Sequence, residues 1–167
     1  RHEYERAIED YGRAIDLDPD DPAAYSNRGA AYVDLHDYER AIEDFERAID
    51  LDPAYVQAYS NRGNAYLALQ EYERAIEDYG RAIELDPEYP QAYSGRGGAY
   101  ADLLDYERAI EDYGRAIELD PDNAQAYSNR GAAYAGLHDY ERAIEDYGRA
   151  IELDPDDAKA YVNRGAA

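Results

Sequence analysis

The sequence predicts an all-α solenoid of antiparallel helix pairs, and its main support is a repeat with a period of 34 residues. Helical spacing of apolar residues and a proline near the end of each copy are the two further supports. The complete copies span 22–55, 56–89, 90–123 and 124–157, without an insertion or deletion. Because a unit of this size buries its apolar face only against its neighbours, we expect one elongated domain over 1–167.

The repeat also assigns the predicted helices in chain order. Residues 1–21 match the last part of the unit, so they are predicted to form the second helix of a partial repeat. Each complete copy is predicted to contribute a first and a second helix. Residues 158–167 match the first part of the unit and predict the first helix of another partial repeat.

The copy 56–89 shows why two helices are expected. Tyr59, Gly63 and Tyr66 lie at spacings of four and three residues, which places them on one side of a helix. A second stripe with helical spacing consists of Tyr72, Ala75, Ile76, Tyr79, Ala82 and Ile83. Acidic residues between the stripes favour the start of the second helix. Pro87 ends that helix because proline lacks an amide hydrogen.

Small residues recur where the two helices of a pair are expected to approach closely. The first helices share a glycine, at Gly29, Gly63, Gly97, Gly131 and Gly165. The second helices share an alanine, at Ala7, Ala41, Ala75, Ala109 and Ala143. Glycine also interrupts second helices at Gly12, Gly80, Gly114 and Gly148, at about 1 kcal/mol each. Close approach of a neighbouring helix or of a ligand would explain those interruptions.

These residues resemble the tetratricopeptide repeat, a family motif with the pattern W-x2-L-G-x2-Y, A-x3-F and P. Here the pattern becomes Y-x2-R-G-x2-Y, A-x3-Y (Phe45 once) and P, for example at Tyr59, Arg62, Gly63, Tyr66, Ala75, Tyr79 and Pro87. Arginine replaces the family leucine at Arg28, Arg62, Arg96, Arg130 and Arg164. We expect each arginine to lay its stem along the interface and to reach an acidic partner, with the Glu-Asp pair of a second helix as the candidate.

The resemblance implies a right-handed superhelix whose first helices line a concave groove. On that basis the groove would carry Ser26, Ser60, Ser94, Ser128, Asn27, Asn61, Asn64, Asn129 and Asn163. An asparagine side chain has a donor and an acceptor, so it can pair with one peptide unit of an extended chain. The series is interrupted at Gly95 and resembles the asparagine ladder in the repeat domain of O-GlcNAc transferase. The alternative is that asparagine was inherited by duplication without a binding role.

Members of this family that act as cochaperones hold a C-terminal carboxylate with Lys and Arg on the groove helices. The corresponding positions carry Gln91 and Gly95 in one repeat, and Gln125 and Asn129 in the next. Lys159 alone keeps a cation there. The sequence therefore argues against binding of an acidic peptide terminus.

The charge balance excludes several classes of partner. Lys+Arg is 17 and Asp+Glu is 39, so the formal net charge is −22. Such a surface repels phosphate backbones and anionic lipid head groups, and we therefore expect neither nucleic acid nor a membrane as a partner. Cysteine is absent, which excludes disulfides and thiolate metal sites.

Residues with catalytic potential do not form a pattern. His2, His36 and His138 share a position at the bend between helices, where other repeats have Gln70 and Leu104. We therefore interpret them as turn residues and expect no catalytic site, no metal site and no cofactor. Aspartates around the Asp-Pro steps lack the central glycine and terminal glutamate of a calcium loop, and turn formation explains them.

Two functions from different classes follow. The first is a scaffold that binds a protein or an extended peptide in the groove lined by asparagine and serine. The second is a structural array, because 158–167 of one chain followed by 1–21 of the next would supply 31 of the 34 positions of a repeat. Stacking of this heterologous kind gives open filaments unless the rotation closes. A window cut from a longer covalent array is the alternative explanation of the incomplete end repeats.

Overall fold

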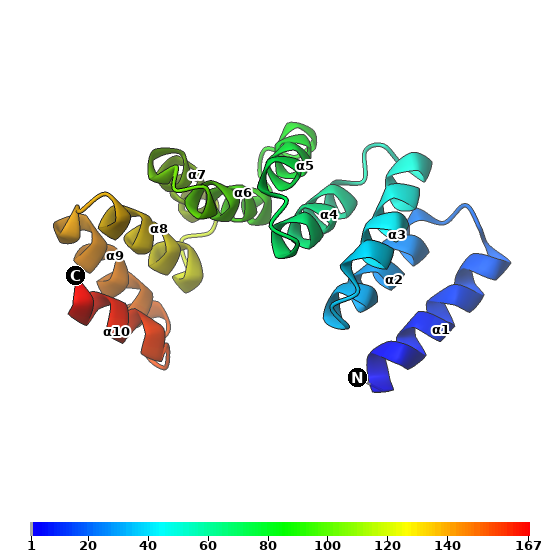
Figure 1. Cartoon of the computed structure of the whole chain (residues 1–167), viewed down its shortest axis with the longest axis horizontal. Coiled ribbons are helices and arrows are strands. Elements are labelled where there is room, and N and C mark those ends of the chain that lie inside the picture. The colour runs from blue at the N-terminus through cyan, green and yellow to red at the C-terminus, as the bar shows by residue number, and fades with distance from the viewer. Residues whose placement is uncertain (1) are drawn as a thin grey trace. The chain divides into compact units, whose positions relative to one another are not determined.

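A computed structural model describes residues 2–167, and within this range the chain forms ten helices and no strand. The described part divides into two compact units, which meet between Pro87 and Glu88. Unit 1 contains α1 (His2–Leu17), α2 (Pro22–Asp34), α3 (Tyr38–Leu51), α4 (Val56–Ala68) and α5 (Tyr72–Leu85) (Figure 1). Unit 2 contains α6 (Pro90–Asp102), α7 (Tyr106–Leu119), α8 (Ala124–Gly136), α9 (Tyr140–Leu153) and α10 (Ala158–Ala166).

Consecutive helices pack against each other in both units, as an all-α solenoid of helix pairs requires. In unit 1, α2 packs on α3 and α4 on α5, while α1 packs on α2 and α3 on α4. Unit 2 repeats this arrangement from α6 to α10. The first helices of successive repeats are also neighbours, α2 beside α4 and α6 beside α8. The predicted fold class is confirmed; the right-handed superhelix and the single elongated domain stay predictions.

Acidic residues begin the second helices, as the sequence predicts. Asp37, Asp105 and Asp139 each accept a hydrogen bond from a backbone N–H in the first turn. The acceptors lie 3.2–3.3 Å from the nitrogens of Arg40, Arg108 and Arg142. Such caps satisfy one of the amide hydrogens that a helix start leaves unpaired. Glu71 stands at the same position of α5 and makes no capping bond with its side chain.

The turn inside each helix pair uses a left-handed backbone conformation. The residues at this position have φ of 61–62°: His36, Gln70, Leu104 and His138. This conformation is costly for a residue with a Cβ atom, so the shared geometry reverses the chain at the expense of local strain. His36 and His138 are therefore turn residues, which confirms the interpretation of the sequence.

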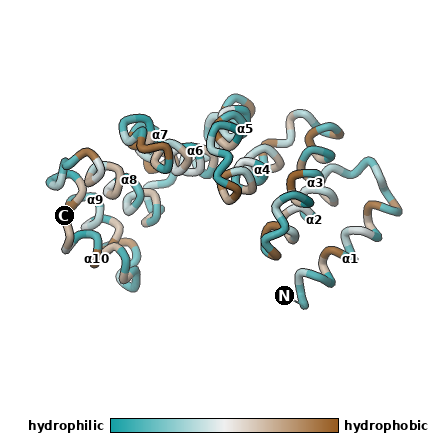
Figure 2. The backbone as a smooth tube through the Cα atoms, in the orientation of Figure 1, coloured by the Kyte–Doolittle hydropathy of each residue, from teal (hydrophilic) through white to brown (hydrophobic). Residues whose placement is uncertain are grey.

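The core of each pair lies where glycine of the first helix meets an aromatic ring of the second. A Cβ atom at Gly29 would lie 2.8 Å from Cε1 of Phe45, and one at Gly63 would lie 3.0 Å from Cε1 of Tyr79. Ala41, Ala75, Ala109 and Ala143 are fully buried at the same interfaces. The close approach is confirmed and is tighter than expected, since even a methyl group at these glycines presses on the ring. Apolar stretches accordingly alternate with polar ones along every helix (Figure 2).

The glycines inside the second helices have a different environment. Ideal Cβ atoms at Gly12, Gly114 and Gly148 would meet a guanidinium nitrogen of the following repeat at 3.8–4.0 Å. These are ordinary contact distances, which leave room for a methyl group. Close packing of a neighbouring helix is therefore not the reason for glycine at these three positions.

Candidate functional site

Charged side chains join the two helices of every complete repeat. The arginine of each first helix donates two hydrogen bonds, from Nε and Nη2, to one aspartate of the second helix at 2.7–2.8 Å. The pairs are Arg28–Asp44, Arg62–Asp78, Arg96–Asp112 and Arg130–Asp146. The expected acidic partner is confirmed, and it is the aspartate of the Glu-Asp pair. Arg164, at the same register position of α10, makes no such pair within residues 2–167.

Burial adjusts the ionisation of these pairs. The aspartate side chains are 6–9% exposed and the arginines 18–24%. The hydrogen bond to Asp44 raises the pKa of Arg28. Burial raises the pKa of Asp78, and its bonds to Arg62 oppose that shift. We interpret the Arg–Asp pairs as parts of the interface between helices, since both hydrogen-bonding edges of each carboxylate are occupied.

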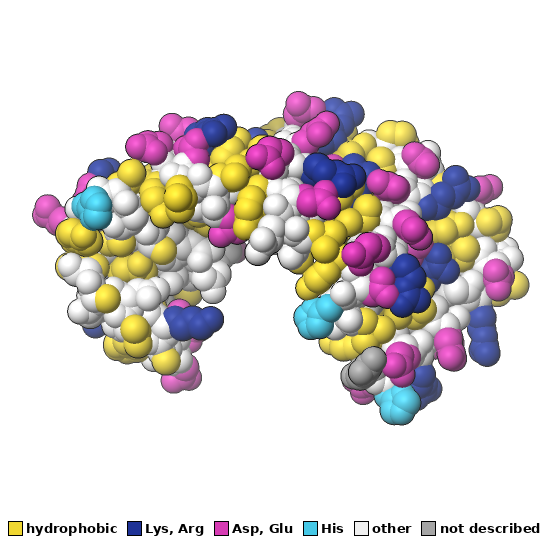
Figure 3. All heavy atoms as spheres, in the orientation of Figure 1, with side chains coloured by type: hydrophobic (Ala, Val, Ile, Leu, Met, Phe, Trp, Pro, Cys, Tyr) yellow, Lys and Arg dark blue, Asp and Glu magenta, His cyan; other side chains and the backbone are white. Residues whose placement is uncertain are grey.

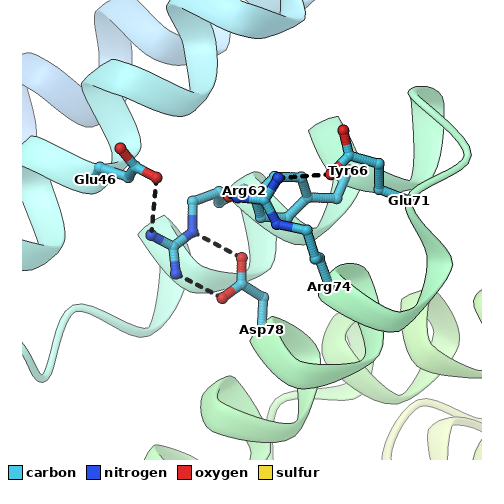
Figure 4. A network of polar contacts seen from close by, with 6 residues as sticks. All are labelled: Glu46, Arg62, Tyr66, Glu71, Arg74 and Asp78. Atoms are coloured by element: carbon cyan, nitrogen blue, oxygen red, sulfur yellow. Dashed lines mark hydrogen bonds and ion pairs between the residues drawn. The ribbon is translucent and has the colours of Figure 1, made fainter.

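A wider network surrounds Arg62 (Figure 4). Its Nη1 lies 4.0 Å from Glu46 of the preceding second helix. Arg74 stacks on Tyr66 with 4.0 Å between the guanidinium carbon and the ring centroid, and it donates a hydrogen bond to the Tyr66 hydroxyl at 2.6 Å. Glu71 accepts a further bond from Arg74. The same stacking occurs at 4.3–4.6 Å in the other complete repeats.

The exposed side of α2 and α4 forms the first candidate surface, which we call the unit 1 face. Asn27 on α2 and Asn64 on α4 are exposed, and Asn61 is half-buried. The hydroxyl of the buried Tyr79 donates to Oδ1 of Asn64 at 2.7 Å and orients that amide. Asn61 and Asn64 line one recess, and Asn27 lies exposed on the neighbouring helix α2; a binding role for these amides stays a prediction.

The predicted serines are in a different position. Ser26, Ser60 and Ser128 are 3–6% exposed, and the hydroxyl oxygen of Ser94 is also buried. Their burial leaves little hydroxyl surface for a ligand, and a role of these serines in a groove stays a prediction. These serines are buried like the alanines Ala24, Ala58 and Ala126 of the same first helices, so their small side chains belong to the packed part of the helix.

A small recess opens on the unit 1 face between α2, α3 and α4. Its volume is about 160 Å³, and it is lined by Ala30, Val33, Asp34, Phe45, Asn61 and Asn64. The apolar lining comes from Val33 and Phe45, and the polar groups come from Asp34 and the two amides. The sequence pattern did not single out Val33, Asp34 or Phe45 as site residues. One signal was available, because Phe45 is the only phenylalanine of the chain and Asn64 stands where other repeats have Ala or Gly.

The corresponding unit 2 face is formed by α6 and α8, with α10 packed on α9. Asn129 is half-buried, and its Oδ1 accepts a hydrogen bond from Gln125 at 2.7 Å. Asn163 on α10 is half-buried beside Lys159 and Val162, which line a shallow recess of about 250 Å³. The amides of unit 2 are thus partly accessible and, at Asn129, already bonded within the helix.

The larger recesses lie between charged side chains of the second helices. One of about 680 Å³ involves Arg62, Glu77 and Arg81, and one of about 520 Å³ involves the matching residues two repeats later. Arg81 and Arg149 there pair with Glu84 and Glu152 at 2.8–2.9 Å. Acidic side chains are spread over the visible surface of the described residues, with arginines among them (Figure 3). Each of these recesses is lined by arginines and by one more acidic side chain than basic ones.

Neither metal ligands nor a membrane span are found within residues 2–167. No group of three His, Asp or Glu side chains in that range could hold a metal ion. His36 and His138 instead lie within hydrogen-bonding distance of the Tyr38 and Tyr140 hydroxyls, at 2.8–2.9 Å. Every helix of that range is too short or too polar to cross a bilayer.

Solved structures with the same arrangement of helices include MamA and YrrB. MamA is 29% identical over 93% of this chain and 91% of its own, with a TM-score of 0.82. YrrB, described as a TPR protein with an unusual peptide-binding site, is 28% identical over 98% and 84%, with a TM-score of 0.80. The first TPR of Spaghetti (RPAP3), bound to the HSP90 peptide SRMEEVD, is 32% identical over 66% and 88%, with a TM-score of 0.66.

Comparison of the sequence with family models covers nearly the whole chain. The model described as TPR repeat matches 1–36, 31–70, 63–103 and 105–138, and the model described as tetratricopeptide repeat matches 124–157. No curated protein sequence matches the chain. The matches agree with the helix pairs and with the period of 34 residues. The chain belongs to the tetratricopeptide repeat family.

Proposed function

We propose that the chain is a non-catalytic scaffold that binds an extended peptide, or an extended segment of a partner protein, on its asparagine-bearing first helices. The observation that carries this proposal is the unit 1 face, where Asn27, Asn61 and Asn64 stand accessible on neighbouring helices. Asn64 is held in place by Tyr79, so less side-chain freedom is lost when it binds.

The chemistry of these amides favours the peptide backbone as the ligand. A peptide unit offers one N–H donor and one C=O acceptor, and an asparagine amide offers the complementary pair. Bonds of this kind do not depend on the side chains of the ligand. We therefore expect binding that tolerates many sequences, with specificity added by recesses beside the amides.

The relatives support a peptide as the class of ligand, but the charge of this chain favours a peptide of a different charge. RPAP3 holds the acidic peptide SRMEEVD, and YrrB has a peptide-binding site by its description. This chain has a net charge of −22 and carries Gln91 and Gly95, or Gln125 and Asn129, at the positions where family members place cations for a carboxylate. Neutral or basic peptides are therefore the proposed ligands.

The test is a binding screen with neutral and basic extended peptides, measured by fluorescence anisotropy. The double variant Asn61→Ala/Asn129→Ala should lose binding, and N-methylation of the peptide backbone should have the same effect. Glu77→Gln, on the exposed side of α5, is the control and should bind as the parent does. Unchanged affinity of the double variant would show that the asparagines are inherited residues without a role in binding.

A second candidate function is end-to-end assembly into filaments. Arg164 of α10 and Asp10 of α1 stand at the register positions of the buried Arg28–Asp44 pair, and both are exposed. Tyr161 and Val162 on α10 are 47% and 69% exposed. A second copy of the chain placed after residue 167 would supply the missing aspartate, and a longer covalent array would do so equally.

Electron microscopy and sedimentation of the 1–167 chain test this assembly. Salt screens repulsion between the acidic copies, so filaments should lengthen from 0.05 to 0.5 M salt if apolar contacts dominate the joint. Arg164→Asp should shorten the filaments, and adding Asp10→Arg should restore them by exchanging the charges. Monodisperse single chains at high concentration under all these conditions would contradict the proposal.

A further inference from the structure

The repeats of this chain are nearly interchangeable, yet two of their unique residues meet at one place. Phe45 occupies a position that is tyrosine in the other second helices, namely Tyr11, Tyr79, Tyr113 and Tyr147. Asn64 occupies a position that is alanine or glycine in the other first helices, namely Ala30, Gly98, Ala132 and Ala166. Both residues line the recess of about 160 Å³ on the unit 1 face.

The two exceptions have complementary effects on this recess. Phe45 lacks the hydroxyl that tyrosine would direct toward the first helices. Asn64 adds an amide at the opposite wall, and Tyr79 orients it by donating to Oδ1 at 2.7 Å. In unit 2 the matching residue Tyr113 keeps its hydroxyl, and burial, together with Asp102 and Asp112, raises its pKa to about 12. Phenylalanine at position 45 therefore leaves out the hydroxyl group that tyrosine carries at this position in the other repeats.

The lining of the recess combines an apolar part with an acidic edge. Ala30 and Val33 form the accessible apolar part, and the fully buried Phe45 ring closes the recess beneath them. Asp34 is exposed at the end of α2 and makes no hydrogen bond or ion pair within residues 2–167. Asn61 is half-buried and Asn64 exposed, so each can turn an amide oxygen toward a ligand; Oδ1 of Asn64 has a second lone pair free.

We propose that this recess binds a lysine side chain of the extended peptide, and this inference rests on the function proposed above. The four-carbon stem of lysine would cover Ala30 and Val33, above the buried Phe45 ring, as long basic side chains do on apolar surfaces. Its ammonium carries three N–H donors, and the edge of the recess offers three acceptors, on Asp34, Asn61 and Asn64. Asp34 supplies the negative charge that fixes the cationic end of the ligand.

An acidic or an uncharged apolar side chain fits the recess less well. A glutamate would meet Asp34 as well as the net charge of −22, so it would be repelled. Norleucine has the length and apolar character of lysine but leaves Asp34 without a partner. The choice of lysine is therefore an electrostatic one, made at the edge of an otherwise apolar site.

Three host peptides of Ala, Ser and Gln with one central lysine, norleucine or glutamate test this inference by fluorescence anisotropy on the full chain. The lysine peptide should bind about tenfold more tightly than the norleucine peptide, because its ammonium adds a charge-assisted hydrogen bond. Asp34→Asn should remove that difference and leave the norleucine peptide unaffected. Phe45→Tyr should weaken both peptides by filling the recess, while its thermal unfolding should match the parent, because tyrosine fits this position in other repeats.

The outcomes separate this inference from the proposed function. Equal affinities of the lysine and norleucine peptides for the parent chain would overturn the lysine site and leave backbone binding intact. A lysine preference that survives Asp34→Asn would also overturn it. Both proposals would be overturned if none of the three peptides bound and if Asn61→Ala/Asn129→Ala changed the affinity of no peptide in the wider screen.

Discussion

In each repeat, one side of the first helix packs on the second helix through unvarying contacts, whereas the other side changes from repeat to repeat. The unvarying side contains the bidentate Arg–Asp pair and the glycine that faces an aromatic ring. The changing side contains Asn27, Asn61, Gly95 and Asn129, with further differences at Ala30 and Asn64. Both sides belong to the same short helices, so comparing them separates the residues that packing requires from those that packing leaves free to vary.

This comparison assigns different physical roles to the two sides. A single change in the buried pair leaves an unpaired charge, and a larger residue in place of the glycine clashes with the ring, so both positions are costly to alter. An exposed position on a helix tolerates most residues. Differences among the repeats on the exposed side are therefore where binding specificity can arise without loss of the fold.

The largest expected effect comes from breaking one buried pair. Asp146→Ala should lower the free energy of unfolding by about 3 kcal/mol, because it leaves Arg130 buried without its carboxylate. Asp78→Ala should cost less, since Glu46 lies 4.0 Å from Arg62 and offers a substitute. Urea denaturation monitored by circular dichroism measures both.

Glu84→Ala, which removes an exposed ion pair with Arg81, is the control and should leave the stability unchanged. Equal costs for Asp146→Ala and Glu84→Ala would show that burial of the pair contributes nothing.

Replacing glycine by alanine should change the free energy of unfolding in opposite directions at two glycine positions of the repeat. Gly29→Ala should destabilise by about 1–2 kcal/mol, because its methyl group would lie 2.8 Å from the Phe45 ring. Gly114→Ala should stabilise by about 0.5–1 kcal/mol, because helix propensity improves and the nearest atom is 3.8 Å away. Thermal and urea unfolding measure the signs. The same sign for both variants would contradict the difference between the registers.

A smaller effect concerns the start of α5. Glu71→Asp should stabilise by about 0.5–1 kcal/mol, since aspartate caps the other second helices and Glu71 makes no capping bond. Bonds from Arg40, Arg108 and Arg142 lower the pKa of Asp37, Asp105 and Asp139 in the folded state. An aspartate at position 71 should have a similarly lowered pKa in the folded state. The stability that it adds should therefore be complete above about pH 5 and should decrease as the pH falls through the ordinary Asp value near 3.9. Urea titrations of parent and variant at pH 7 and pH 3 measure this difference, and a gain that grows on acidification would contradict the capping role.

The smallest effect is expected on the exposed side of the first helices. Asn27→Ala should change the free energy of unfolding by less than about 0.5 kcal/mol, because the side chain is exposed and makes no contact that the fold requires. Urea denaturation checks this value. A loss above about 1 kcal/mol would assign Asn27 a role in the fold and remove the contrast between the two sides.

The sequence allowed the fold to be predicted in detail, and the site only in part. Period, helix order, acidic helix starts and the turn residues follow from local rules that repeat every 34 residues. The partner of Arg62 required a choice between Glu77 and Asp78, which only packing decides. The burial of Ser26 and Ser60 beside the accessible Asn27 and Asn61 was not predicted, because one residue along a helix rotates a side chain by about 100° and only packing decides which side is covered. The recess at Phe45 depends on three helices, and its volume has no signature in any one of them.

The Arg–Asp pairs also bear on how a chain of this kind changes its length. Both members of each pair lie in the same complete repeat, sixteen residues apart. A recombination event that inserts or deletes one whole unit would therefore carry each arginine together with its counter-ion. An array with more or fewer complete units would keep every one of these arginines paired within its own repeat.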